Sequence, residues 1–159
     1  RPDDERIPDS FEIARKMGLS YSFGIANLTS AHPNSVVLEV KGKSGRTLEV
    51  QACSLGGGRI MINRLDGLDV NCSCEIPTLI VHNLDQPGHV AEVTSMLAHK
   101  SVNIANMSLY RDKRGGSAVM VVEMDQPLPK ESLEWLEHLE GIVKVTYINV
   151  TEGEEDDVL

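Results

Sequence analysis

The chain has 159 residues, a formal net charge of -9 and 41% hydrophobic residues, a composition typical of one ordinary globular domain or two small ones. The acidic surplus excludes nucleic acid as an expected partner, because phosphate binding needs Lys and Arg gathered on one face. No apolar run reaches the roughly 18 residues of a membrane span, and no signal-peptide pattern opens the chain. We therefore expect no membrane partner and a cytoplasmic location. Because the chain opens on Arg1 rather than Met, we also expect that an N-terminal part is missing.

The first 75 residues predict one short helix followed by a meander of strands. The run "PDSFEIARKMG" has apolar residues at helical spacing and Gly18 as a stop. Short aliphatic runs separated by Gly, Asn and Asp then predict strands: "LSYSFGIANL", "NSVVLEVKG", "RTLEVQACSL", "RIMINRLDG" and "DVNCSCE". Gly45 and Gly67 fit tight hairpin turns. The run of glycines from Gly56 to Gly58 is interpreted as a turn rather than an anion-binding nest, because no Lys-Ser/Thr pair follows it.

Three cysteines, an odd number in a chain without export signals, favour reduced thiols over a disulfide framework. Cys72 and Cys74 would lie on the same face of a strand, and Cys53 could join them around a metal or an iron–sulfur cluster. Their spacing matches no usual ligand pattern, and Cys is often a small buried hydrophobe. The sequence therefore favours a structural role for all three.

From Glu75 onward the pattern changes to strand, helix, strand, strand, helix, strand. The strands are predicted in "TLIVHNL", "NIANMSLYR", "SAVMVVEM" and "VKVTYINV", and the helices in "PGHVAEVTSMLAHK" and "PKESLEWLEHLEG". Val90, Val93 and Leu97 are predicted to face the core from the first of these helices. This order predicts an antiparallel four-stranded sheet with two helices on one face, a ferredoxin-like βαββαβ unit. Residues 151–159 are predicted to be an acidic, solvated tail.

The opposite face of this predicted sheet also carries apolar residues, since "NIANMSLYR" and "SAVMVVEM" are apolar on both faces. A sheet-sized apolar patch in water is unfavourable. We therefore expect self-association, with a two-fold dimer as the commonest arrangement.

The stretch "HNLDQPGHVAEV" places a carboxylate at the junction of a strand and a helix. Asp85 could bind the ammonium group of a small amino acid, and the free N–H groups of the following helix could bind its carboxylate. Gly88 would let the ligand approach the backbone, while Asn83 and Asn103 could recognise a hydroxyl or amide. The structural alternative is that Asp85 merely caps the helix and Pro87 begins its first turn.

The segment "DQPGHVAEVTSMLAHKSVNIANMSLYR", within its βαββαβ frame, resembles the ACT domain, an amino-acid-sensing regulatory module. The resemblance covers residues 76–150. It implies that an effector lies where the first strand meets the first helix, at the interface with a second copy. The residues implied for one wall of this site are Asn83, Asp85, Gln86, Gly88 and His89. Asn103 is implied to reach across from the partner subunit.

The preceding half, with "HPNSVVLEVKGKSGRTLEVQACSLGGGRI" and "DGLDVNCSCEIPTLIV", resembles the β chain of the bacterial iron–sulfur-dependent L-serine dehydratases. By this resemblance residues 1–75 are the latter part of an α/β allosteric substrate-binding domain, which some 3-phosphoglycerate dehydrogenases also carry. Its usual opening portion, with a Ser-Ser-His-Thr segment, has no counterpart here. The expected fold class is therefore α+β, a truncated α/β domain followed by an ACT domain.

The same resemblance implies a function. L-serine would be converted to pyruvate and ammonia by a [4Fe-4S] cluster that the α chain holds, so this chain would carry neither catalytic residues nor the cluster. The expected partners are the α chain, a second copy through the ACT domain, and serine or another amino acid. Two alternatives remain open: the regulatory region of another amino-acid enzyme, such as a 3-phosphoglycerate dehydrogenase, and a stand-alone metal or thiol protein.

Overall fold

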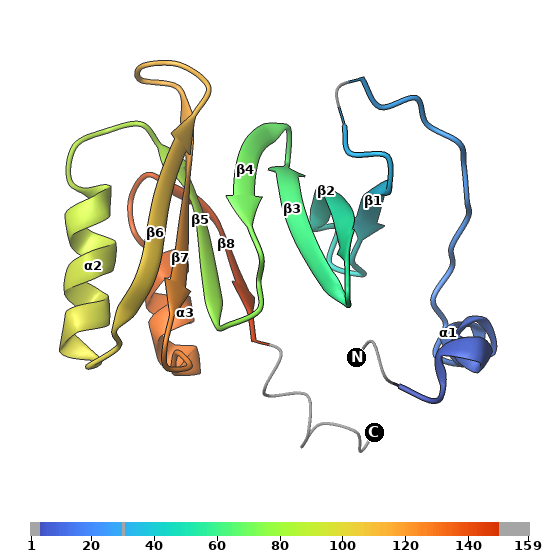
Figure 1. Ribbon diagram of the computed structural model, residues 1–159. Helices are drawn as coiled ribbons and strands as arrows, with labels where there is room; N and C mark the ends of the chain where they lie inside the picture. The colour runs from blue at the N-terminus through green and yellow to red at the C-terminus, as the bar shows by residue number, and fades with distance from the viewer. Residues whose placement is uncertain (1–3, 30, 150–159) are drawn as a thin grey trace.

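The computed structural model describes residues 4–29 and 31–149, and two antiparallel four-stranded sheets follow one another along this part of the chain (Figure 1). The first sheet is a meander in which each strand pairs with the next. Its strands are β1 (Ser35–Lys41), β2 (Thr47–Gly56), β3 (Arg59–Leu65) and β4 (Leu68–Cys72). The glycines predicted to form the hairpin turns have positive φ, 85° at Gly45 and 84° at Gly67, so the predicted turns are confirmed.

The segment before the first sheet differs from the prediction. A 3-10 turn (Ile7–Asp9) leads into helix α1 (Ser10–Lys16) as expected, but the predicted strand at residues 19–28 is wrong, because this segment has neither helix nor strand. Its aromatic side chains pack on the helix instead. The ring centroids of Tyr21 and Phe23 lie 5.3 Å and 5.7 Å from that of Phe11. A strand needs a neighbouring strand for its hydrogen bonds, and β1 pairs only with β2.

The second sheet has the predicted βαββαβ order, which confirms the α+β class and the ferredoxin-like unit. Its strands lie in the order β6-β7-β5-β8, with both helices on one face (Figure 1). The elements are β5 (Thr78–Leu84), α2 (His89–His99), β6 (Ile104–Arg111), β7 (Ser117–Met124), α3 (Lys130–Glu137) and β8 (Ile142–Ile148). None of the helices described is long and apolar enough to cross a membrane. The predicted acidic tail, 151–159, lies outside the described residues.

The core between the helices and the second sheet is aliphatic, as the composition suggests. Leu79 and Val81 of β5 are fully buried in it, together with Val93 and Leu97 of α2. Val90, predicted to share that helical face, is instead 40% exposed. The inward face of α2 is completed by Met96, so the buried stripe is displaced from the predicted one.

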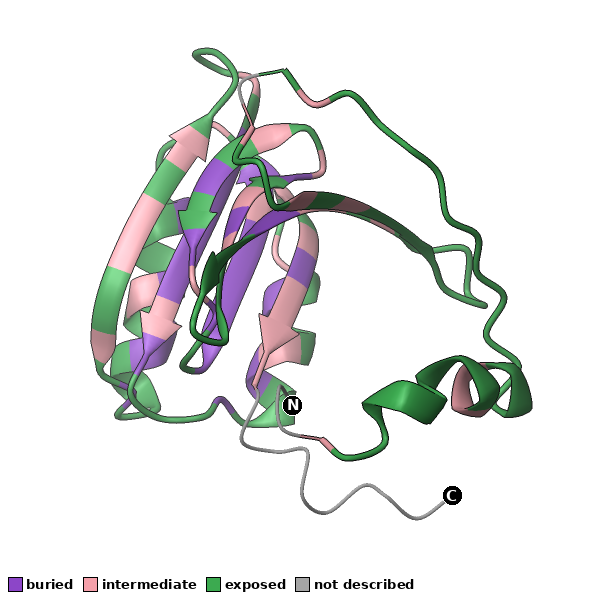
Figure 2. Cartoon of the chain, turned by 45° about the vertical axis from the view of Figure 1, so that its right-hand side comes forward, coloured by how far each residue is buried: buried purple, intermediate pink, exposed green. Residues whose placement is uncertain are grey.

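The other face of the second sheet is covered by the first sheet, which corrects the expectation that self-association covers it. Ile80 of β5 and Val119 and Val121 of β7 are almost fully buried there. They pack against residues of the first sheet: Ala52, Ile62, Leu65, Val70, Cys72 and Cys74, the last just beyond β4. Figure 2 shows buried residues, in purple, along the middle strands of the second sheet. The sequence reveals only that both faces of these strands are apolar. Which surface covers the second face depends on contacts between residues far apart in the chain.

Candidate functional site

Asp85 lies directly after β5, where the chain turns toward α2, and its carboxylate is tied to the β6–β7 hairpin. Oδ2 accepts a hydrogen bond of 2.9 Å from the Gly115 N–H and an ion pair of 3.1 Å from Arg111 Nη1. The Asp85 N–H in turn donates to the Gly116 carbonyl at 2.9 Å. The Gly115 N–H and then Arg111 hold the pKa of Asp85 below its usual value. The group therefore remains an anion at neutral pH.

The capping role that the sequence offered Asp85 as an alternative is not observed. Helix α2 has Gly88 at its N-cap, with φ 111°, and no side chain caps it. The first intrahelical bond at this end runs from the Glu92 N–H to the Gly88 carbonyl at 2.9 Å. The N–H groups that precede it, from His89 to Ala91, have no partner within the helix. A charged carboxylate therefore precedes an uncapped helix start by three residues, and the junction carries both an acceptor and free donors.

Two predicted site residues, Asn83 and His89, are buried rather than exposed at this junction. The Asn83 Nδ2 donates to the Leu84 carbonyl at 2.6 Å, while His89 Nδ1 lies 3.2 Å from Glu92 Oε2. Asn83 Oδ1 and His89 Nε2 are buried without a hydrogen-bond partner among the described residues. Buried polar atoms are rarely left unpaired in native proteins, so a bound group or water would complete Asn83 Oδ1. The edge of the His89 ring that carries Nε2 lies against Gly141 instead.

The remaining predicted residues lie in different places. Gln86 and Gly88 are exposed in the loop between β5 and α2. Asn103 precedes β6, whereas Arg111, which contacts Asp85, ends that strand. Eight residues of β6 place the two ends roughly 25 Å apart, so one chain does not bring Asn103 to Asp85. Within its own chain the Asn103 Nδ2 donates to Asp125 Oδ2 at 2.6 Å.

The sequence interpretation missed Arg111 and Gly115, which hold the Asp85 carboxylate in place. Arg111 ends the predicted strand "NIANMSLYR", and Gly115 lies in the "DKRGG" turn that follows it, so neither was predicted to belong to the site. The sequence did hold a signal for this contact, namely the cluster of positively charged side chains at the turn of the neighbouring hairpin. The β6–β7 hairpin and the start of α2 lie at the same end of the second sheet (Figure 1).

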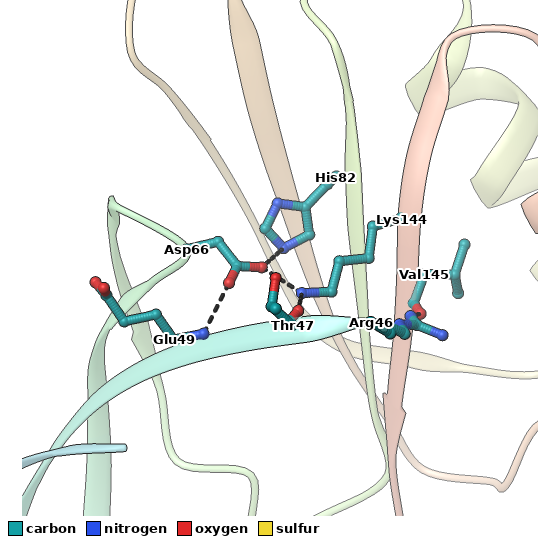
Figure 3. A network of polar contacts seen from close by, with 7 residues as sticks. All are labelled: Arg46, Thr47, Glu49, Asp66, His82, Lys144 and Val145. Atoms are coloured by element: carbon teal, nitrogen blue, oxygen red, sulfur yellow. Dashed lines mark hydrogen bonds and ion pairs between the residues drawn. The ribbon is translucent and has the colours of Figure 1, made fainter. Parts of the chain in front are cut away.

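A second polar cluster joins the two sheets away from Asp85 (Figure 3). Asp66, in the β3–β4 turn, accepts from Lys144 Nζ at 2.5 Å and lies 3.6 Å from His82 Nε2. Burial opposes ionisation of Asp66, but the hydrogen bonds from Lys144 and from the Glu49 N–H outweigh it and lower the Asp66 pKa. Burial also lowers the pKa of His82. This cluster connects β5 and β8 to the first sheet.

The cysteines do not form the metal site that the sequence left open. Ala52 and Cys72 both pair with Ile62 and share the core face of the first sheet, so the neighbouring Cys53 points to the other face. The sheet therefore separates Cys53 from Cys72 and Cys74. Within the described part of the chain, no group of three or more His, Cys, Asp or Glu side chains could hold a metal ion.

The fold and the strand-to-helix junction define an ACT domain, and the ACT family model matches residues 77–140. Over 150 residues, 94% of the chain, the protein is 31% identical to the L-serine dehydratase beta chain of Peptoniphilus asaccharolyticus and covers 68% of it. It is 33% identical over 145 residues, 91% of the chain, to the probable L-serine dehydratase beta chain of Bacillus subtilis strain 168, of which it covers 66%. The protein belongs to the family of L-serine dehydratase β chains, and it spans about two thirds of the length of these relatives.

A more distant similarity covers a smaller part of the chain. The D-3-phosphoglycerate dehydrogenase of Methanocaldococcus jannaschii is 31% identical over 90 residues, which are 57% of this chain and 17% of that enzyme. This similarity is therefore to a small part of the dehydrogenase.

Proposed function

We propose that this chain is a regulatory part of an L-serine dehydratase and that its ACT domain binds L-serine, or another small amino acid, at a dimer interface. The observation that carries the proposal is the charged Asp85, three residues ahead of the uncapped start of α2. A zwitterion needs an anion for its ammonium group and N–H donors for its carboxylate, and this junction offers both.

Polar atoms that lack a hydrogen-bond partner support a ligand with an ammonium group and a hydroxyl group. No described residue donates to Asp85 Oδ1, since both hydrogen bonds go to Oδ2. This oxygen is available to an ammonium group. Asn83 Oδ1 is buried nearby along the chain without a partner among the described residues. It would be satisfied by a ligand hydroxyl or by a water that the ligand retains.

The geometry of β6 explains how Asn103 would reach the site. β6 is an edge strand of the second sheet, so its outer edge can pair with another strand. Antiparallel pairing of two β6 strands about a two-fold axis would place the first residues of one strand beside the last residues of the other. Asn103 of the partner subunit would then lie beside Arg111 and Asp85 of this chain. The proposed site therefore needs two copies.

The chemistry of serine dehydration is assigned to a partner chain. A [4Fe-4S] cluster is held by cysteine thiolates, usually four, and this chain has three cysteines that the first sheet divides. These residues do not fit such a cluster. We propose that an α chain holds the cluster and converts serine to pyruvate and ammonia, while this chain binds the effector and contributes no catalytic residue.

Titration calorimetry with L-serine tests the site. Asp85→Asn removes the charge with little change of shape, so serine affinity should fall at least about tenfold, the size of a lost charge-assisted hydrogen bond. Asp69→Asn is the matched control, because the Asp69 side chain is 95% exposed, and it should leave affinity unchanged. Equal affinity of the Asp85 variant and the wild type would place the site elsewhere.

Mixing two single variants tests whether the site is shared between subunits. If Asp85 and Asn103 of different chains form one site, a mixed dimer of Asp85→Asn with Asn103→Ala carries both changes in one site and none in the other. Mixing two weakly binding variants, after exchange of subunits, should then restore high-affinity serine binding at one site of each mixed dimer. A mixture that binds no better than its components would show that each chain has its own complete site.

A further inference from the structure

Cys72 and Cys74 are in direct contact through their sulfur atoms. The two Sγ atoms are 3.0 Å apart, and both side chains are buried between the sheets. In a regular strand, residues two positions apart are separated by about 6.6 Å, which exceeds the distance of about 3.8 Å between the Cβ atoms of a disulfide. A regular strand would therefore keep this pair apart.

The backbone at Cys74 accounts for the contact. Its φ is +53°, a left-handed conformation that is unfavourable for a residue with a Cβ atom. β4 ends at Cys72, and the positive φ turns the Cβ of Cys74 away from its direction in an extended chain. Glycine and asparagine adopt this conformation most readily, but the residue here is a cysteine. The surrounding fold therefore holds Cys74 in a strained conformation.

Neighbouring contacts hold the segment on both sides of the pair. Tyr110 Oη accepts from the Asn71 N–H at 3.0 Å, and Ser73 Oγ donates to Glu123 Oε1 at 3.2 Å. Both partners belong to the second sheet. The two sulfurs therefore lie at the connection between the sheets, anchored before Cys72 and between the two cysteines.

We propose that Cys72 and Cys74 are a dithiol that a small peroxide oxidises reversibly to a disulfide within one chain. The Cys72 sulfur attacks one peroxide oxygen as the O–O bond breaks, and the hydroxide that leaves takes up the proton that the Cys72 thiol loses to give the first water. The resulting sulfenic acid is attacked by the Cys74 sulfur, which loses its proton as the S–O bond breaks and a second water leaves. Two thiols are oxidised and one hydrogen peroxide is reduced to two waters.

Cys72 is assigned as the attacking sulfur. The hydrogen bond from the Cys74 thiol lowers the pKa of Cys72, whereas the same contact and burial raise the pKa of Cys74. The thiolate is the nucleophilic form of cysteine. Because both sulfurs are buried, the co-reactant is a compact peroxide rather than a bulky disulfide such as oxidised glutathione.

Cys53 provides an internal control. It is as well buried as the pair, with 4% exposure against 3% for Cys72 and 7% for Cys74, but it lies on the opposite face of the first sheet. Oxidation that depends on burial or accessibility alone would affect all three thiols alike. Oxidation that depends on the contact between the two sulfurs would spare Cys53.

The test treats the folded full chain with hydrogen peroxide, then alkylates free thiols in denaturant and maps the peptides by mass spectrometry. We expect the intact mass to fall by two hydrogen atoms, the titratable thiols to fall from three to one, and the crosslink to join Cys72 to Cys74. Dithiothreitol should restore all three thiols. Cys53→Ser should behave like the wild type, and Cys72→Ser should form no intrachain bridge.

Three results would overturn the proposal: three free thiols after treatment, over-oxidation of Cys72 without a bridge, or a bridge that includes Cys53. Each can be read whether or not the chain binds serine, so the outcome is independent of the proposed function.

Discussion

At the scale of single residues, the junction between β5 and α2 illustrates how a local pattern leaves the role of a side chain open. The motif around Asp85 fits both a helix cap and a ligand-binding carboxylate. The structure excludes the cap, because α2 has no side-chain cap and Asp85 bonds to the β6–β7 hairpin instead. Its acceptor role follows from residues 26 and 30 positions later in the chain.

Gly141, beside the same junction, supports a prediction about packing. A Cβ atom at this position would lie 2.6 Å from two atoms of the buried His89 ring, and φ is +80°. Gly141→Ala should therefore destabilise the fold by about 2–5 kcal/mol, the sum of left-handed strain and overpacking. Urea denaturation measures this change.

Gly45→Ala is the matched control for this change. Its φ is +85°, but nothing lies within 4 Å of the added Cβ atom, so only the strain of about 1–2 kcal/mol remains. Equal destabilisation by the two variants would show that the contact with His89 is not tight.

At the scale of elements, β7 is a strand of the second sheet that is covered on both faces, as β5 is. Its alternate residues face α2 and α3 on one side and the first sheet on the other. Strands buried on both faces have continuous apolar sequences rather than alternating ones, and "SAVMVVEM" is of this kind. The sequence thus predicts a second covering layer but does not identify it.

Adjacent residues of β7 test this double burial. Val121 is 2% exposed against the first sheet, and Val122 is fully buried against the helices. Val121→Ala and Val122→Ala should each cost about 1–3 kcal/mol, because each removes buried methyl groups. Val40→Ala, at a residue that is 50% exposed, should cost less than about 1 kcal/mol. A nearly neutral Val121→Ala, measured by urea denaturation, would contradict the packing of the two sheets.

At the scale of the whole molecule, the contact between the two sheets combines an apolar interior with a polar cluster. Lys144 of β8 bonds to Asp66 and, at 2.9 Å, to the Thr47 carbonyl. Arg46 also donates to the Val145 carbonyl. These bonds cross from the ACT domain to the preceding unit (Figure 3). Because polar pairs fix geometry more strictly than apolar contacts do, they set how the first sheet sits on the second.

His82 makes this contact sensitive to pH. Burial places its pKa in the folded chain below the ordinary value of 6.5, so the unfolded chain binds the proton more readily. Its contribution to stability is fully present above pH 6.5 and is lost as the pH falls through the folded pKa. The pKa of Asp66 is also lowered, so its contribution to stability is lost only at a more acidic pH, below its ordinary pKa of 3.8.

We therefore expect the melting temperature of the wild type to fall between about pH 7.5 and about pH 5. The fall should be smaller in His82→Gln, which keeps a polar side chain but cannot titrate. Thermal denaturation across this range measures both. A variant that loses as much stability as the wild type would mean that His82 does not sense the proton.

The sequence by itself determined the order of the elements, because helical and strand periodicities and turn glycines are local. All eight strands of the described residues and the βαββαβ order could be predicted in this way, although one further strand, at residues 19–28, was wrongly predicted. The position of Asp85 before a helix also followed from the sequence. The tertiary structure alone decided what covers the second sheet, which groups hold Asp85, and how Cys72 meets Cys74. These features depend on contacts between distant segments and on one left-handed residue, and local patterns do not record either.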